Sequence, residues 1–475
     1  MLRLQHEEDF HMQHDQPKLK IRPLEALIVT LILLGGISYS IIFSGVVPHV
    51  PIVLAVICLL AYGLIKRVSI KDLEEGLLDG AKSGLGAVFI FFFIGMLISS
   101  WMASGTIPTF IYIALEVVDG KFFYAITFVV TSIIGLSVGS SLTTAATIGV
   151  AFMSVSSALG LSEAITAGAI ISGAFFGDKM SPLSDTTSLA SMIVKVDIFE
   201  HIKNMTWTTG PAFIIALILF ALLSPSEASA SFEMIDTLKA KLVELELVHW
   251  YSLIPFLLLT ILALRKVSAI ITLSSSVLAA VILGFFVQSD FSIEKMMNLL
   301  FFGFKSNTGV AEIDALLTRG GMESMMFSIS LVLLALSMGG LLFKLGIFPA
   351  LLEGMKGLLS KQTSLISATA GTAIGINLLL GEQYLSILLT GNAFQDSYDK
   401  AGLERKNLSR VLEDAGTVIN PLVPWSVCGV FLTGVLGVAT IDYFPFAFFC
   451  LLSPILTVGF GLTGFTITKS EKAAA

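Results

Sequence analysis

The sequence predicts an all-α polytopic membrane protein with two inverted-topology repeats, proline-broken helices and re-entrant elements, crossing the bilayer about 12–14 times. Composition is the first reason: 55% of the residues are hydrophobic and 13% are charged, against about 25% charged residues in ordinary soluble domains. The second is a repeated spacing of glycine and proline. The third is a set of acidic residues inside otherwise apolar segments.

Glycine and proline residues recur at almost the same intervals in both halves of the chain. In the first half, Pro108 lies 28 residues after Gly80 and 74 residues before Pro182. The corresponding intervals in the second half are 28 and 72 residues, between Gly321, Pro349 and Pro421. Pro108 and Pro349 are 241 positions apart, which indicates a tandem repeat. Repeats with broken helices at matching positions are typical of secondary transporters.

The repeats divide the chain into five parts. A polar tail, 1–22, comes before the first repeat, 23–224; a connector, 225–249, leads to the second repeat, 250–466, and a short tail, 467–475. A bilayer-crossing helix needs roughly 17–25 apolar residues. Runs of this kind lie at 24–46, 48–65, 87–104, 122–138, 206–224, 250–264, 268–287, 324–343, 362–380 and 444–466. Further crossings are expected in the Gly-, Ser- and Thr-rich stretches 139–200 and 381–435.

The connector begins polar and becomes amphipathic. Its apolar residues share one helical face, at Phe232, Ile235, Leu238, Leu242 and Leu245. This pattern predicts an interfacial helix on the extracytoplasmic surface, with a dimer contact as the alternative.

Basic residues predict the orientation of each half. In the first half they flank the first two apolar runs on both sides, at Lys18, Lys20, Arg22, Lys66, Arg67 and Lys71. The positive-inside rule places both flanks in the cytoplasm. In the second half the basic pair Arg265 and Lys266 lies between the first two runs instead. The halves are therefore expected to enter the membrane from opposite sides, with both chain termini in the cytoplasm.

Two proline-containing segments interrupt the apolar pattern at matching places, 173–187 and 412–426. Pro182, Pro421 and Pro424 each remove a backbone donor and displace the carbonyl four residues earlier. We therefore expect unpaired carbonyls and helix ends at membrane depth. Such backbone is tolerated only where it lines a cavity or binds a ligand.

Acidic residues accompany both interruptions. They are Asp178, Asp185, Glu413, Asp414 and, at the start of another apolar segment, Glu382. An ionisable group at the bilayer centre costs about 2.5–3.5 kcal/mol, so these residues require a function or a partner. The alternatives to an ion-binding role are a helix end or interface, for Glu382 above all, and a charge pair with Lys179.

The oxygen-rich composition of these segments suits sodium. Broken helices supply carbonyls and helix C-termini to such ions, and Asp178, Asp185 and Asp414 are the predicted Na⁺ ligands. Neutral oxygens come from Ser181, Ser184, Thr186, Thr187, Thr417, Asn420 and Ser426. Burial favours the protonated carboxylate and a bound cation favours the charged one, so a proton and Na⁺ would compete for one group. That competition suffices for exchange.

Two shorter polar segments precede the interruptions at similar distances. Ser140, Ser141, Thr143 and Thr144 lie 38 to 42 residues before Pro182, and Gln383 lies 38 residues before Pro421. We interpret them as paired tips that line the site. The alternative for a single serine or threonine is a hydrogen bond to its own helix carbonyl.

Histidine is predicted to be absent from every spanning segment, because the six histidines lie in the N-terminal tail and at His49, His201 and His249. Proton transfer, for which histidine is the usual side chain near neutral pH, is therefore assigned to the carboxylates. Two Gly-x-x-x-Gly pairs, Gly173 with Gly177 and Gly371 with Gly375, predict close helix packing.

The segment GDKMSPLSDTTSLA at 177–190 and its partner LEDAGTVINPLVPW at 412–425 resemble the signature stretches of the NhaC family of sodium/proton antiporters. The resemblance extends from about residue 23 to 466. It implies a bacterial inner-membrane antiporter, often a homodimer, in which both halves meet at a central site. By this resemblance the ion site is lined by Asp178, Ser181, Ser184, Asp185 and Thr186 from one half and by Glu413, Asp414, Thr417 and Asn420 from the other.

The resulting prediction is a secondary active Na⁺(Li⁺)/H⁺ antiporter that works by alternating access in the lipid bilayer, without cofactor or nucleic acid. Relatives with similar motifs exchange organic acids, so the alternative is a Na⁺- and H⁺-coupled exchanger of acids such as malate and lactate, or an amino acid carrier. There Lys179 would meet the substrate carboxylate, and the candidate additional contacts are Glu382, Gln383, Thr143 and Thr144. A membrane enzyme would need a nucleophile and base or metal ligands in one membrane layer, and no His or Cys is placed for that. A channel would not need proline-broken inverted halves.

Overall fold

The computed structural model describes residues 17–117, 122–225, 239–240, 242–244, 247–265, 267–287, 292–306, 314, 318, 320–355 and 362–470. Every regular element in these ranges is helical, and the pairing of Leu403 with Lys469 is an isolated β-bridge. The predicted all-α class is confirmed.

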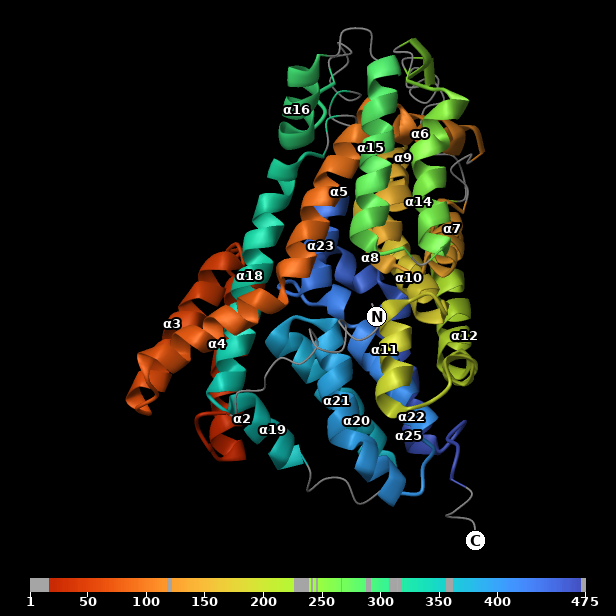
Figure 1. The fold of residues 1–475 in the computed structure, drawn as a ribbon. Helices are drawn as coiled ribbons and strands as arrows, with labels where there is room; N and C mark the ends of the chain where they lie inside the picture. The colour runs from red at the N-terminus through yellow and green to blue at the C-terminus, as the bar shows by residue number, and fades with distance from the viewer. Residues whose placement is uncertain are drawn as a thin grey trace. The chain divides into compact units, whose positions relative to one another are not determined.

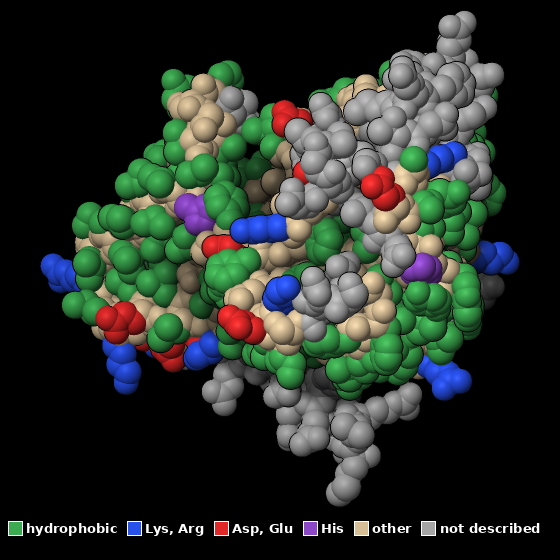
Figure 2. Space-filling model, turned by 90° about the horizontal axis from the view of Figure 1, so that it is seen from above, with side chains coloured by type: hydrophobic (Ala, Val, Ile, Leu, Met, Phe, Trp, Pro, Cys, Tyr) green, Lys and Arg blue, Asp and Glu red, His purple; other side chains and the backbone are tan. Residues whose placement is uncertain are grey.

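Several helices are long and apolar enough to cross a membrane. Among the described residues, five pass by length and composition: α2 (Pro23–Ile42), α5 (Leu85–Ala103), α12 (Ile198–Leu223), α15 (Ala269–Val287) and α18 (Met322–Lys344). Counting each of two bent helix pairs as one span raises the number to seven, and five further apolar helices are shorter. Many large hydrophobic side chains are exposed, and they form broad areas of the face seen in Figure 2. The chain is a multi-pass membrane protein, and the 12–14 crossings stay a prediction.

One compact unit comprises Met1–Gly84 and Leu333–Gly357. Its described helices are α2, α3 (His49–Ile65), α4 (Ile70–Ser83), the C-terminal half of α18 and α19 (Ile347–Met355). α4 approaches α18 closely, because a Cβ on Gly80 would lie 2.2 Å from the Leu336 carbonyl oxygen. An ion pair of 3.0 Å between Lys344 and Glu75 joins the same two helices.

The other unit, Leu85–Val332 and Leu358–Ala475, holds both proline-containing segments (Figure 1). Its first-half elements are α5, α6 (Thr106–Val117), α7 (Phe123–Val138), α8 (Ser141–Thr144), the π-helix η1 (Ala145–Gly149), α9 (Val150–Ala158), α10 (Glu163–Met180), α11 (Asp185–Val194) and α12. A 3₁₀ turn, η2 (Trp250–Leu253), leads into α14 (Ile254–Leu264), α15, α16 (Ile293–Phe302) and the start of α18. The remaining elements are α20 (Gln362–Leu380), α21 (Gln383–Lys400), α22 (Arg405–Val411), the π-helix η4 (Leu412–Thr417), η5 (Asn420–Leu422), α23 (Val427–Leu436), α24 (Thr440–Tyr443), η6 (Phe444–Phe446) and α25 (Phe448–Thr463).

Glycines with positive φ mark the same junctions in both halves. Gly105 and Gly346, with φ of +79° and +71°, come directly before α6 and α19. Gly139 and Gly381, with φ of +70° and +67°, end α7 and α20. Only glycine adopts this backbone at low cost. The offsets between the partners are 241 and 242 residues, which supports the tandem repeat. The inversion of the halves stays a prediction.

Of the two predicted glycine pairs, one packs as expected and one does not. α10 lies directly against α7, where a Cβ on Gly177 would come within 2.5 Å of the Gly135 carbonyl carbon and the Ser132 carbonyl oxygen. For Gly371 and Gly375, a Cβ would meet nothing within 4 Å. The prediction of close packing is therefore wrong for this second pair. Spacing alone does not determine which face of α20 meets another helix.

Gly177→Ala should reduce the stability of the protein by about 1–3 kcal/mol, because the added methyl must separate two backbones that touch. Gly371→Ala and Gly375→Ala are matched controls in which a methyl meets open space inside α20, and we expect both to unfold at the wild-type temperature or above it, because alanine favours the helix. An unfolding temperature of Gly177→Ala that equals or exceeds the wild-type value, as in the two controls, would contradict the α7–α10 contact.

The segment after α25 is held against the loop and helix that precede η4. The amide of Ser470 donates to the Gly402 carbonyl at 2.8 Å, and that of Glu404 donates to the Thr468 carbonyl at 3.1 Å. Asn407 holds Thr468 from both sides, donating to its carbonyl at 2.7 Å and accepting from its amide at 3.1 Å. Residues 466–470 thus form a strap along the start of α22.

The amphipathic helix predicted in the connector lies mostly outside the described residues, Phe232, Ile235, Leu238 and Leu245 included. Of the predicted face, Leu242 is described and is buried. The connector and the five-part division stay predictions.

Candidate functional site

Both proline-containing segments interrupt helices as predicted. α10 ends at Met180 and α11 begins at Asp185, with the Ser184 hydroxyl accepting from the Thr187 amide at 3.3 Å. In the second half α22 passes into η4 and η5 before α23, which Ser426 caps by accepting from the Gly429 amide at 3.0 Å. The first four backbone amides of a helix have no acceptor within that helix, and these serine side chains accept from one of them at each interruption.

Several carbonyls at the interruptions already have partners. The Asp178 carbonyl accepts from the Ser181 amide at 3.0 Å, and the Asn420 carbonyl accepts from the Ser426 hydroxyl at 2.5 Å. These are the carbonyls four residues before Pro182 and Pro424, so the expectation that they are unpaired is wrong. Buried carbonyls without a hydrogen bond are costly, and nearby serines satisfy these two.

A fully buried ion pair joins the two interrupted segments. Lys179 on α10 pairs with the Asp414 carboxylate on η4, and neither side chain is exposed. The second Asp414 oxygen accepts from the Thr208 hydroxyl on α12 and from the Thr457 hydroxyl on α25, both at 2.8 Å. The Lys179 ammonium also lies 5.6 Å from the Phe449 ring centre. The alternative that Lys179 pairs with one of the carboxylates is therefore confirmed.

The carboxylate next to Asp414 has the opposite environment. Glu413 is fully buried, and neither of its carboxylate oxygens has a hydrogen-bond partner among the described residues. The hydroxyl of Thr417, four positions later and also fully buried, lacks a partner as well. Both residues belong to the π-helix η4, a rare kind of element that is frequent at functional sites. A buried carboxylate in this state is stable only with a proton or a cation bound.

The two aspartates of the first interruption differ in exposure. Asp178 is 5% exposed and accepts from the Ser141 amide at 3.0 Å, at the start of α8. Asp185, in the first turn of α11, is exposed. The first interruption thus presents one buried and one accessible acid.

The three carboxylates predicted to hold Na⁺ do not form one cluster. Asp414 pairs with Lys179, Asp178 binds Ser141, and Asp185 is exposed. Among the described residues no three Asp, Glu, His or Cys side chains gather in a metal-binding arrangement. Their role as ion ligands stays a prediction.

The predicted tips begin helices at matching positions. Ser140 caps α8 by accepting from the Thr143 amide at 3.3 Å, and the half-buried Glu382 caps α21 by accepting from the Leu385 amide at 2.8 Å. The helix-end alternative for Glu382 is thus confirmed. Gln383, next in sequence, is 6% exposed and its side-chain oxygen has no partner in the described part of the chain.

Most of the predicted hydroxyl ligands are buried and already hydrogen-bonded. Thr144 donates to the Ser140 carbonyl at 2.8 Å, so for this residue the alternative of a hydrogen bond to its own helix is confirmed. Thr143 accepts from the Ser140 hydroxyl at 3.0 Å. Ser181 accepts from the Leu183 amide at 3.2 Å, and Ser184 and Thr186 share a hydrogen bond of 3.1 Å.

Asn420 is hydrogen-bonded through both ends of its side-chain amide. Its amide nitrogen donates to the Asn377 side chain at 2.8 Å, and its amide oxygen accepts from the Cys428 amide at 2.9 Å. Asn377 in turn donates to the Gly416 carbonyl at 2.6 Å. These bonds hold η4, η5 and the start of α23 together.

Sequence reasoning missed residues contributed by neighbouring helices. Asn377, Thr208 and Thr457 are buried polar side chains in apolar helices. Because a polar side chain inside an apolar helix costs free energy unless it has a partner, the presence of these residues could have indicated a site. Nothing in the sequence indicated that two of them meet Asp414.

The prediction that no spanning segment contains a histidine is wrong, because His201 lies in α12. α12 begins at Ile198, eight residues before the apolar run predicted from position 206, because charged Glu200 and Lys203 belong to its first turns. The His201 side chain is fully buried, and neither ring nitrogen has a partner among the described residues.

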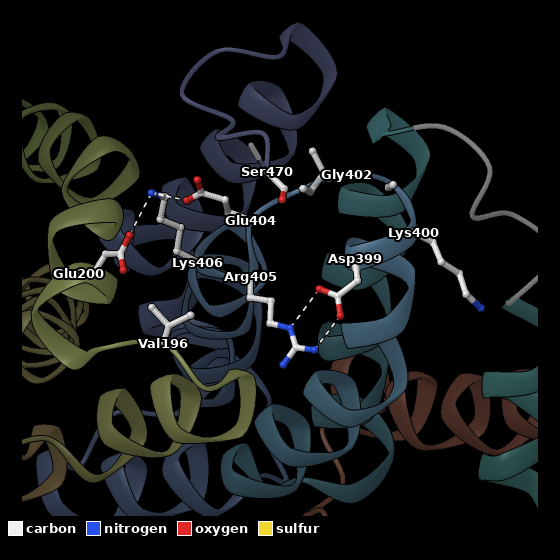
Figure 3. Close-up of a pocket in the computed structure, with 11 residues that line it drawn as sticks. Val196, Glu200, Asp399, Lys400, Gly402, Glu404, Arg405, Lys406 and Ser470 are labelled. Carbon is white, nitrogen blue, oxygen red and sulfur yellow. Dashed lines mark hydrogen bonds and ion pairs between the residues drawn. The ribbon is translucent and has the colours of Figure 1, made fainter. Parts of the chain in front are cut away.

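A charged cleft of about 980 Å³ lies where the loop before α12 meets the end of α21 and the start of α22. In Figure 3, Lys406 lies between Glu200 and Glu404. Arg405 donates two hydrogen bonds to the Asp399 carboxylate, at 2.6 and 3.0 Å. The Lys406–Glu200 ion pair measures 3.0 Å. These pairs connect α12, α21 and α22 at the cleft.

Comparison with known proteins gives a consistent result. The model of the Na⁺/H⁺ antiporter family matches residues 173–465. The Na(+)/H(+) antiporter NhaC of Alkalihalophilus pseudofirmus is 43% identical over 94% of this chain and 97% of its own length. NhaC of Bacillus subtilis is 43% identical over 87% and 92%, and the malate-2H(+)/Na(+)-lactate antiporter of the same organism is 33% identical over 93% and 95%.

Proposed function

The chain belongs to the NhaC family of Na⁺/H⁺ antiporters, and from this premise we propose that it exchanges Na⁺ for H⁺ by alternating access at the buried carboxylates of the two interrupted segments. The observation that carries the proposal is Glu413, a buried carboxylate without a partner, next to the Lys179–Asp414 pair. Glu413 has no hydrogen-bond partner and is available to bind a proton or a cation, and Asp414 already binds a cation that another could replace.

The chemistry of the two acids supports competition between the ions. Na⁺ binding to Asp414 requires the Lys179 ammonium to leave that carboxylate, because both positive charges need the same oxygen atoms. Glu413 is uncharged when protonated and needs a cation when deprotonated. In either case one ion enters as another leaves. Transport then requires only that the loaded forms change the side to which the site opens.

Asp178 is the third proposed carrier. It lies at the amino end of α8, where backbone amides favour negative charge. Asp185, which is exposed, would receive the ion first, and Ser181, Ser184, Thr186 and Thr417 would supply neutral oxygens. We place the protein in the bacterial inner membrane with both termini in the cytoplasm, and we include Li⁺ as a second substrate and a homodimer as the assembly.

The coupled carrier of organic acids is the second candidate, since one relative is named as a malate/lactate exchanger. It needs a cation that can meet a substrate carboxylate. Lys179 is engaged by Asp414, which favours plain exchange of ions over recognition of an acid.

Proteoliposomes with a proton gradient and an internal pH-sensitive dye test the proposal, with Na⁺, Li⁺, K⁺, malate and lactate added separately. We expect Na⁺ and Li⁺ alone to dissipate the gradient. Asp178→Asn should reduce this to background, whereas the exposed Asp442→Asn should transport normally. A response to Na⁺ only in the presence of malate or lactate would establish the coupled carrier instead.

A further inference from the structure

His201 is an exception to the usual pairing of buried polar groups. Its side chain is fully buried in the first turn of α12 with both ring nitrogens unpartnered among the described residues. Most buried side-chain polar atoms have a hydrogen-bond partner, because an unpaired one costs free energy. An apolar side chain would fill this position at lower cost. The imidazole therefore needs a reason other than packing.

The position of His201 on α12 lies between the charged cleft and the buried ion pair. Glu200, its neighbour in sequence, lines the cleft (Figure 3). Asn204 and Thr208, three and seven residues later, lie on the same helical face. Asn204 donates to the Lys406 carbonyl at 2.7 Å, and Thr208 donates to Asp414 at 2.8 Å. The rise from His201 to Thr208 is about 10 Å.

Several of the elements that pack around α12 carry charged groups. α22 brings Lys406 and Arg410 toward α12, and α10 brings Asp178 and Lys179. α11 contributes Asp185 and η4 contributes Glu413 and Asp414; the segments of α7 and α25 contain no Asp, Glu, His, Lys or Arg. The Lys179–Asp414 pair is linked to α12 through Thr208, whose hydroxyl donates to Asp414 at 2.8 Å. Among the described residues, the buried acid that is hydrogen-bonded to α12 beyond His201 is therefore Asp414, the partner of Lys179.

We propose that His201 relays protons between the charged cleft and the Lys179–Asp414 pair. A proton from water in the cleft binds one ring nitrogen, and the proton on the other ring nitrogen leaves toward the pair. The imidazole is neutral before and after, in the opposite tautomer, and resets by rotation of the ring. Water spans the remaining distance to Lys179 or Asp414. This relay rests on the proposed Na⁺/H⁺ exchange and assigns the cleft as the entry for protons on one side of the membrane.

His201→Leu tests the relay because leucine fills the space but cannot carry a proton. We expect turnover in proteoliposomes to fall at least tenfold, with the largest deficit at alkaline pH, where protons are scarce and their delivery limits the rate. The unfolding temperature should stay equal or rise, since the histidine makes no hydrogen bond to lose. Binding of ²²Na⁺ at alkaline pH should stay unchanged. His249→Leu, at a half-buried histidine stacked on Tyr251, is the matched control and should transport normally.

A wild-type pH–rate profile for His201→Leu would overturn the relay. If that variant does not fold, His201→Gln decides instead, since glutamine keeps hydrogen bonding but does not titrate: a normal profile excludes the relay, and an alkaline deficit supports it. The wild-type protein in the same vesicles separates the two proposals. Absence of Na⁺/H⁺ exchange there defeats the proposed function, whereas exchange that His201 variants leave intact defeats only the relay.

Discussion

Asp414→Asn should abolish Na⁺/H⁺ exchange and destabilise the protein by about 3–5 kcal/mol. The substitution leaves the Lys179 ammonium buried without its counter-charge, since Asp414 is the carboxylate with which it pairs. Burial of an unpaired charge is among the largest single costs in a folded protein. Transport in proteoliposomes and thermal unfolding in detergent measure the two effects separately.

The double variant Lys179→Met with Asp414→Asn is the control for this prediction. It removes both charges, so most of the lost stability should return while exchange stays absent. Recovery would show that the stability loss came from the unpaired lysine and the transport loss from the missing carboxylate. Unchanged stability of Asp414→Asn alone would contradict the ion pair, and retained exchange would contradict Asp414 as a carrier.

Glu413→Gln should reduce exchange about 100-fold or more while leaving stability unchanged or improved. The expected effect on stability is thus the opposite of that of Asp414→Asn. Neither Glu413 oxygen has a hydrogen bond that the substitution would remove. Glutamine keeps the size of the side chain but cannot bind or release a proton. The same transport assay and the same thermal unfolding give both readouts.

Thr417→Val is the matched companion, since it removes an unpartnered hydroxyl one turn from Glu413. We expect a weaker apparent affinity for Na⁺ with stability unchanged. If Glu413→Gln instead lost several kcal/mol of stability with normal exchange, Glu413 would be a structural residue and the proposed site would be wrong at this position.

The broken helices and their acids could be predicted because their signals are local in the sequence. Proline cannot donate a backbone hydrogen bond, so Pro182 and Pro421 mark interruptions without any tertiary information. A carboxylate in an apolar run is conspicuous for the same reason. Glycines with positive φ, such as Gly139 and Gly381, lie where helices end.

The pairing of the buried groups could not be predicted, since it depends on how distant helices pack. Lys179 and Asp414 are 235 residues apart, and nothing in the sequence separates Asp414 from Glu413 beside it. The π-helix turns one acid toward the lysine and leaves the other without a partner. His201 was missed because charged neighbours obscured the first turns of α12.

The strap formed by residues 466–470 has a practical consequence for handling the protein. A purification tag or fluorescent reporter fused directly after Ser470 would pull on the backbone bonds that hold this segment to Gly402 and Glu404. Those bonds reach the first turn of α22, which leads without a break into the acids of η4. A fusion at that end therefore needs a long flexible spacer, and a functional assay on such a fusion should always be paired with one on a protein tagged at its other terminus.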